Sequence, residues 1–193
     1  MRKQISEVRA WQDTIVIPTY LLGPEDPNPP LLVGRRGLIH PGSRIVYPYA
    51  LQEDLSNRKE DKTWRILHLE NRYLHLGVLP ELGGRLLFAY DKASRREALH
   101  YNHVIKYAPI GIRGAFFAGG IEWNFPNGHT ATTSSPVDCA IRGNDDGSVT
   151  LLLGDIERVS RMRWSVGITL TRDHASFETE MRLYNRTVLP HRH

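Results

Sequence analysis

"WRILHLENRYLHLGVLPELGGRLLFAYDK", residues 64–92, carries the strongest structural signal in the chain. Apolar and polar residues alternate along it, which is the pattern of β-strands that place one face on a core. Turn residues interrupt the alternation at 70–72 and again at 80–84. The segment therefore predicts two consecutive β-hairpins.

The C-terminal half repeats this pattern. Turns are predicted at 144–147, 159–161 and 172–174, and residues 164–186 alternate as half-buried sandwich strands do. No window shows helical periodicity for more than about two turns. The sequence therefore predicts an all-β protein, built as an antiparallel β-sandwich.

The N-terminal part is less regular. A strand is predicted over 6–22, where Pro18 indicates either a sheet edge or a break between two strands. The Pro-rich and charged residues 23–63 are predicted to form a long irregular connection over the surface. Residues 1–193 are long enough for one good core, so we expect a single domain.

Composition excludes several classes of function. The net charge is +4, but the arginines are scattered among acids and form no dense basic run, so we expect no nucleic-acid partner. No apolar run approaches the roughly 20 residues that cross a bilayer, and the N-terminus lacks the apolar stretch of a signal peptide. A single cysteine, Cys139, excludes a disulfide framework. We expect a cytoplasmic protein with no membrane partner.

"GGIEWNFPNGH", residues 119–129, is the candidate functional segment. Its alternation puts Ile121, Trp123 and Phe125 on one face and the polar side chains on the other. Glu122 is either a general acid/base or sugar-hydroxyl acceptor, or a strand-edge glutamate paired with an arginine. Trp123 either stacks on a sugar or belongs to the core.

Three further side chains are candidates for binding. His129 follows a predicted Asn127–Gly128 turn, so it either points into a groove or is an ordinary turn histidine. Arg85 and Arg113 follow glycine-rich turns, and their guanidinium groups either bind vicinal hydroxyls and carboxylates or form structural salt bridges with Glu81, Glu122 or Asp138. The histidine pairs His100/His103 and His68/His75 lack a further ligand, so no metal is predicted.

Residues 78–101, "VLPELGGRLLFAYDKASRREALHY", read as strand, Leu-Pro-x-x-Gly-Gly turn, strand and Asp-Lys-x-Ser turn. Together with "GGIEWNFPNGH" and with "GDIERVSRMRWSVGITL" running into "MRLYNRTVLPHR" (154–192), they resemble an uncharacterised family of galactose-mutarotase-like domains. That family is found at the N-terminus of large bacterial proteins with tetratricopeptide repeats. The resemblance covers most of the chain from about Thr63 onward. It implies a β-supersandwich that binds sugars in a groove across one sheet.

The resemblance implies a carbohydrate ligand and a glycoside hydrolase- or epimerase-like activity without a cofactor. The alternative is a non-catalytic sugar-binding or scaffold module of a multidomain repeat protein. In the epimerases the general base is a glutamate late in the domain, which no position here matches. Hydrolysis would need two carboxylates, and Asp138 and Glu157 are the second candidates after Glu122. The predicted groove consists of catalytic Glu122 and His129 and substrate-binding Arg85, Arg113, Trp123 and Asn124.

Supersandwich domains of this kind are normally longer than 193 residues. The chain is therefore expected to be an N-terminal fragment. If strands are missing, unpaired sheet edges remain, and a homodimer or a strand-swapped oligomer is expected to cover them.

Overall fold

The computed structural model describes residues 7–27, 46–126 and 128–190. Within these ranges the chain forms eleven strands and no helix, and the strand pairings within the sheets are antiparallel. The prediction of an all-β, antiparallel protein is confirmed. None of these residues belongs to a helix with the length and apolarity that membrane crossing requires.

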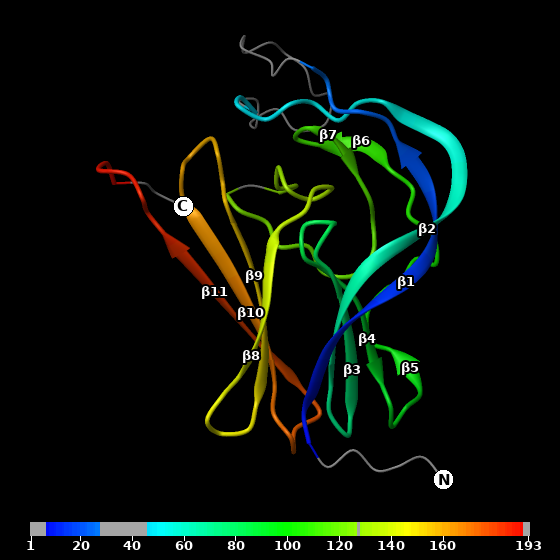
Figure 1. Ribbon diagram of the computed structural model, residues 1–193, viewed down its shortest axis with the longest axis vertical. Helices are drawn as coiled ribbons and strands as arrows, with labels where there is room; N and C mark the ends of the chain where they lie inside the picture. The colour runs from blue at the N-terminus through cyan, green and yellow to red at the C-terminus, as the bar shows by residue number, and fades with distance from the viewer. Residues whose placement is uncertain (1–6, 28–45, 127, 191–193) are drawn as a thin grey trace.

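The strands form three sheets. Their bounds are β1 (Arg9–Leu22), β2 (Leu55–Glu70), β3 (Leu74–Leu79), β4 (Arg85–Asp91), β5 (Arg96–Glu97), β6 (Ala108–Gly111), β7 (Gly114–Phe116), β8 (Asp138–Gly143), β9 (Val149–Ile156), β10 (Arg163–Leu170) and β11 (Phe177–Tyr184). One sheet has the order β1-β2-β3-β4-β5 and another the order β11-β10-β9-β8, while β6 and β7 pair separately. The two large sheets face each other (Figure 1).

The main core lies between the two large sheets. Leu67 and Leu69 of β2 and Leu76 of β3 meet Trp164 and Ile168 of β10 in one hydrophobic cluster. Leu67 and Leu69 are two residues apart and Trp164 and Ile168 are four apart, so each pair lies on one face of its pleated strand. Burial of this apolar surface is what joins the two sheets.

The predicted turns are confirmed. Residues 71–73 and 80–84 connect β2, β3 and β4, and the other three predicted turns connect β8 to β11. The buried Asn71 accepts hydrogen bonds from the N–H groups of Tyr73 and Leu74, both at 2.8 Å. Its amide donates to the carbonyls of Thr171 and His174, at 2.7 and 2.9 Å. This one side chain therefore ties the β2–β3 turn to the β10–β11 turn.

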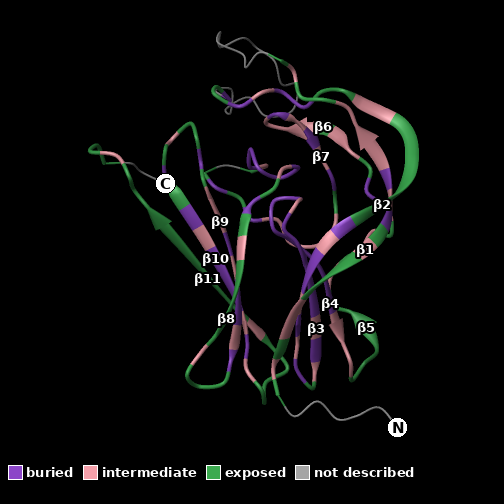
Figure 2. Ribbon diagram, in the orientation of Figure 1, coloured by how far each residue is buried: buried purple, intermediate pink, exposed green. Residues whose placement is uncertain are grey.

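The five-stranded sheet packs against hydrophobic clusters on both of its faces. Trp64 and Ile66 of β2 point away from the main core into a second cluster. Ile105 and Phe117, from the segment that carries β6 and β7, cover this second face. Figure 2 shows the result as nearly continuous burial along β3 and the first part of β4.

The course of strand β1 distinguishes between the two interpretations of Pro18. The strand is continuous through Pro18 and lies at the edge of its sheet, so the edge alternative is confirmed and the break is wrong. The prediction of an irregular connection over 23–63 is wrong at its C-terminal end, because β2 begins at Leu55 and pairs with β1. Residues 28–45 of that prediction lie outside the described residues.

Gly120 is the glycine whose lack of a side chain matters most near the candidate site. Its φ is +65°, and a Cβ there would overlap the carbonyl oxygen of Leu86, whose backbone pairs with Ile121. We expect Gly120→Ala to lower the free energy of unfolding by about 2–4 kcal/mol, from strain plus overlap. The measurement is urea denaturation.

Gly147 provides the matched control. Its φ is +79°, and no atom lies within 4 Å of the position of a Cβ. Gly147→Ala therefore adds only backbone strain, about 1 kcal/mol. Equal losses in the two variants would show that the approach of residue 120 to β4 is not what requires glycine.

Candidate functional site

The segment 119–129 is held against the end of the main core by its apolar residues. Ile121 forms an isolated bridge with Leu86 of β4, in which the two backbone N–H groups donate at 2.9 and 3.2 Å. Trp123 and Phe125 are buried in the main cluster, and the Trp123 indole N–H donates to the carbonyl of Gly84 at 2.8 Å. The predicted alternation is thus confirmed for the apolar face, and it turns Glu122 and Asn124 the other way.

Glu122 and His129 meet. Nδ1 of His129 lies 2.6 Å from Oε2 of Glu122, and the two side chains are 27% and 10% exposed. Thr130 closes the loop, because its hydroxyl donates to the carbonyl of Phe125 at 2.8 Å and its N–H donates to Oδ1 of Asn124 at 3.3 Å. Asn127, half of the predicted turn, lies outside the described residues.

An aromatic ring and a buried cation complete the surroundings of this pair. The ring of Phe116 lies 3.9 Å from that of His129, centroid to centroid. The buried guanidinium of Arg85 donates to the carbonyl of Gly119 and to the hydroxyl of Thr133, and it lies over the ring of Phe117. Burial lowers the pKa of Arg85, and the charge of Glu122 opposes that change.

The second carboxylate oxygen of Glu122 is unusual. Among the described residues, Oε1 of Glu122 is buried and has no hydrogen-bond donor. A buried carboxylate oxygen is costly unless a positive charge compensates it. The electrostatic interaction with Arg85 provides that compensation. Glu122 is therefore a largely buried hydrogen-bond acceptor, and His129 is the more exposed member of the pair.

The arrangement of the Glu122 carboxylate and the His129 imidazole is suited to proton transfer. When the ionised carboxylate accepts the Nδ1–H of His129, the imidazole is fixed in one tautomer and Nε2 carries the lone pair. A carboxylate that orients an imidazole also stabilises the imidazolium formed when Nε2 takes a proton. An imidazole and a carboxylate arranged in this way can act as a general acid/base and as the group that orients it.

The other predicted binding residues are not all gathered around this pair. Trp123 is only 8% exposed, so the core alternative describes it and its ring is not presented to a ligand. Asn124 is exposed and lies on the loop that closes onto His129. Arg85 lies behind the pair as a buried cation rather than on an open surface.

Arg113 is occupied by structural contacts. Its guanidinium pairs with Glu25 at 2.6 Å and donates to Ala50, Ala131 and Ser135. The structural alternative for Arg113 named Glu81, Glu122 or Asp138 as the partner, and that choice of partner is wrong. The carboxylate comes from the N-terminal segment after β1, 88 residues away in sequence, which no local pattern could indicate.

Neither second-choice carboxylate accompanies Glu122. Both oxygens of the buried Glu157 accept backbone N–H groups, from Val159 at 3.0 Å and Ser160 at 2.6 Å, so this residue shapes the β9–β10 turn. Asp138 begins β8 and lines a different surface. In the described part of the chain, no three His, Cys, Asp or Glu side chains are grouped so that they could hold a metal ion.

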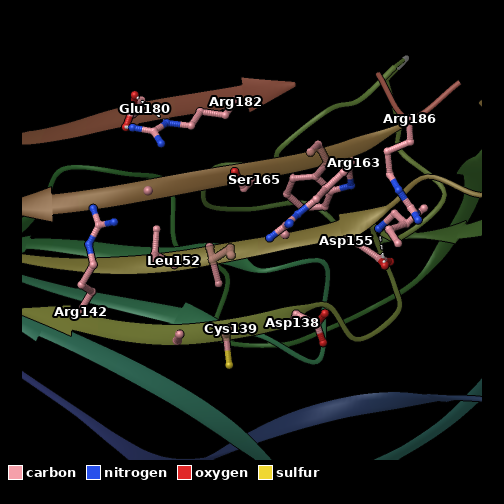
Figure 3. Close-up of a pocket in the computed structure, with 16 residues that line it drawn as sticks. Asp138, Cys139, Arg142, Leu152, Asp155, Arg163, Ser165, Glu180, Arg182 and Arg186 are labelled. Carbon is pink, nitrogen blue, oxygen red and sulfur yellow. Dashed lines mark hydrogen bonds and ion pairs between the residues drawn. The ribbon is translucent and has the colours of Figure 1, made fainter. Parts of the chain in front are cut away.

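The outer face of the β8–β11 sheet carries a concave surface of about 630 Å³ (Figure 3). Its lining includes small and apolar residues together with four arginines and three acids. The charged residues are Arg142, Arg163, Arg182, Arg186, Asp138, Asp155 and Glu180. Arg182 forms a two-point contact with Glu180, at 2.9 and 3.0 Å. The surface is therefore of mixed charge, and part of that charge is paired within one strand.

An aromatic and histidine cluster lies on the other face of the five-stranded sheet, and the contacts between its members could not be predicted from the sequence. Nε2 of His75 on β3 lies 2.9 Å from Nδ1 of His68 on β2. Trp11 of β1 stacks on both rings, at 4.8 and 5.7 Å between centroids. The pairing of Glu70 with His75 and of Trp11 with His68 sets this arrangement.

Burial lowers the pKa of both His68 and His75, and a charge on His68 lowers the pKa of His75 further. The charges of Asp13 and Glu70 raise the pKa of His68 and so partly offset its burial. For His75, Glu70 raises the pKa and Lys92 lowers it. The folded pair therefore takes up protons at lower pH than the unfolded chain does.

We expect this pair to make stability depend on pH. As the pH falls below the ordinary histidine pKa of about 6.5, the unfolded chain binds protons that the folded pair does not, so stability decreases. The measurement is the melting temperature between pH 7.5 and 5.5. The double variant His68→Gln/His75→Gln should flatten this dependence, whereas His103→Gln, at an exposed position, should not. An unchanged slope in the double variant would contradict the expectation.

Comparisons with known proteins agree with this fold. A crystal structure of a TPR-domain containing protein from Parabacteroides distasonis superposes with a TM-score of 0.82 and 30% sequence identity, over 95% of this chain. The chain spans 30% of the length of that protein. The family described as "Domain of unknown function (DUF5107)" matches residues 42–192, which is most of the chain. The protein thus belongs to the DUF5107 family.

Proposed function

We propose that this domain is galactose-mutarotase-like and binds a free aldose at the Glu122–His129 pair, where it catalyses interconversion of the sugar's anomers. The observation that carries the proposal is the 2.6 Å contact between Nδ1 of His129 and Oε2 of Glu122. It gives an imidazole that is 27% exposed a fixed tautomer beside the ring of Phe116, which offers an apolar surface. Resemblance of "GGIEWNFPNGH" to that superfamily supports a sugar as the ligand.

The reaction requires the transfer of one proton from the sugar to the protein and the transfer of one proton back to the sugar. Nε2 of His129 accepts the proton of the anomeric hydroxyl, the bond between C1 and the ring oxygen breaks, and C1 becomes a carbonyl. The imidazolium returns the proton to the former ring oxygen. Ring closure on the opposite face of the carbonyl, with the same transfers reversed, gives the other anomer. Glu122 stabilises the imidazolium throughout, as an adjacent carboxylate does.

Contacts around the pair favour this reaction over glycoside hydrolysis. Hydrolysis uses two carboxyl groups that flank the scissile bond. Glu122 is bound to His129, while Glu157 is committed to backbone N–H groups and Asp138 lies on another surface. Mutarotation requires only acid/base transfer, which one oriented histidine can supply.

A non-catalytic role is the second candidate, and one comparison favours it. The similar crystal structure is of a TPR-domain containing protein, and this chain spans only part of it. A domain in such a protein can serve as a sugar-binding or scaffold module without turning over its ligand. In that case the Glu122–His129 pair would take hydroxyl hydrogen bonds and nothing more.

Polarimetry distinguishes the two. The protein is mixed with freshly dissolved α-anomers of galactose, glucose, mannose, xylose and arabinose, and the approach to anomeric equilibrium is followed against buffer. Acceleration for at least one sugar, lost in His129→Gln but kept in His103→Gln, is the expected result. Sugar-induced shifts of the His129 ring signals without acceleration would identify a binding module. Neither acceleration nor shifts for any sugar would overturn the proposal.

A further inference from the structure

A half-buried group of rings crosses β1, β2 and β3 on the face of the sheet that carries the second hydrophobic cluster. Nδ1 of His68 and Nε2 of His75 lie 2.9 Å apart, and Trp11 stacks on both imidazoles. The ring of Phe88 meets the ring of His75 edge-on, at 5.2 Å between centroids. The neighbouring rings therefore hold the two imidazole nitrogens close together in the folded protein.

The strand register adds a carboxylate to the same face. Trp11 pairs with His68 and Asp13 pairs with Ile66, so Asp13 lies diagonal to His68 on the side where both imidazoles lie. The Asp13 side chain is exposed, and its charge opposes the burial that lowers the pKa of His68. The prediction of no metal rested on the lack of a further ligand for the histidine pair, and this register supplies a candidate.

The other charged groups beside the pair have partners of their own. Glu70, opposite His75 in the register, forms an ion pair with Lys92 at 2.7 Å. Arg9, opposite Glu70, lies over the ring of Trp11. Burial lowers the pKa of both imidazoles, and the charge of Glu70 only partly offsets it. Neutral imidazoles bind metal ions, so both rings are in the binding form at neutral pH.

We infer that His68 and His75 bind a divalent transition-metal ion of tetragonal geometry, Cu(II) or Ni(II), with Asp13 as a third ligand once its exposed side chain rotates toward them. Imidazole nitrogens bind such ions at about 2.0–2.1 Å, so two of them at a right angle lie about 2.9 Å apart. The tetrahedral angle of zinc requires about 3.3 Å. The observed distance of 2.9 Å therefore fits the tetragonal ions, and water takes their remaining positions.

Metal binding changes a tautomer and releases no proton. In the hydrogen-bonded pair, one of the two facing nitrogens carries the shared proton. When the ion takes both lone pairs, that proton moves to the other nitrogen of its own ring, and each imidazole stays neutral. Two imidazoles and one carboxylate favour Cu(II) over the other divalent ions, and we expect a dissociation constant of about 1 µM.

Titration of the protein with CuCl2 at neutral pH, followed by electron paramagnetic resonance, tests the site. The background is His191→Gln/His193→Gln, because two histidines one residue apart can chelate Cu(II) by themselves. His68→Gln and His75→Gln should each weaken binding by about tenfold or more, and Zn(II) should bind more weakly than Cu(II) by a similar factor. His103→Gln, at an exposed position, should bind normally. Normal Cu(II) binding by His75→Gln would overturn the inference.

Two variants that preserve the histidine pair give an independent readout. Trp11 touches both imidazoles, so bound Cu(II) should quench its fluorescence, and the other three tryptophans are buried. Trp11→Phe keeps a stacked ring and should bind Cu(II) normally while losing most of the quenching. Asp13→Asn, at an exposed position, should weaken binding about threefold. Full quenching in Trp11→Phe, or no quenching in the unmodified protein with Cu(II) bound, would show that the ion lies elsewhere and would overturn the assignment.

Discussion

Glutamine in place of Glu122 is expected to slow aldose mutarotation by a factor of about 10² or more while leaving the fold intact. The amide keeps the shape of the side chain and can still accept a hydrogen bond from His129. It loses the charge that holds one tautomer and stabilises the imidazolium. Removal of the 2.6 Å charge contact should therefore act on turnover far more than on sugar binding.

The tautomer itself can be measured. Nitrogen-15 chemical shifts of the His129 ring should report one tautomer, with the proton on Nδ1, in the unmodified protein and a mixture in Glu122→Gln. Glu53→Gln, at an exposed position outside the site, is the control and should change neither rate nor shifts. A variant that melts early but turns sugar over at the normal rate would show that Glu122 serves stability alone.

Arg85→Met is expected to lower the free energy of unfolding by about 3 kcal/mol. Methionine retains the apolar stem but removes the buried charge that faces Glu122, the contact with the Phe117 ring and two hydrogen bonds. The carbonyl of Gly119 and the hydroxyl of Thr133 would lose their donor, and Glu122 would lose its compensating cation. Chemical denaturation gives the free energy directly.

Two further variants separate charge from hydrogen bonding at this position. Arg85→Lys keeps the charge without the fork, so it should recover part of the loss. In a double-mutant cycle, Glu122→Gln should make Arg85→Met less costly by at least about 0.5 kcal/mol, because the uncompensated carboxylate is gone. Arg96→Met, at an exposed position on β5, should stay within about 0.5 kcal/mol of the unmodified protein. Additive losses in the cycle would contradict an electrostatic link between the two residues.

The part of the site that could be predicted from sequence is the part set by local geometry. Alternation in residues 121–125 follows from the pleat of an extended chain, so Glu122 could be placed opposite to Trp123 without a structure. The close approach of Gly120 to the backbone of Leu86, by contrast, could not be predicted from the sequence. The signal for Phe116 was weaker: two adjacent phenylalanines beside the motif, with nothing to show which one faces His129.

Choices between alternatives depended on distant residues. Trp123 was equally a stacking ring or a core residue until the opposing sheet was in place, because burial depends on what lies on the other side. Arg113 and Arg85 both follow glycine-rich turns. Arg113 is bound by Glu25, whereas Arg85 interacts electrostatically with Glu122. Local sequence could not separate them, since each partner is brought in by a different part of the fold.

The class of the fold and the positions of most turns could be predicted from the sequence alone. Both depend on interactions between residues a few positions apart: the two-residue period of a strand and the backbone preferences of Gly, Pro, Asn and Asp. The tertiary structure decided which strands are neighbours, that the five-stranded sheet is buried on both faces, and that His68 touches His75. These features depend on the register and packing of segments far apart in the chain, and their free energy comes from surfaces that exist only once those segments meet.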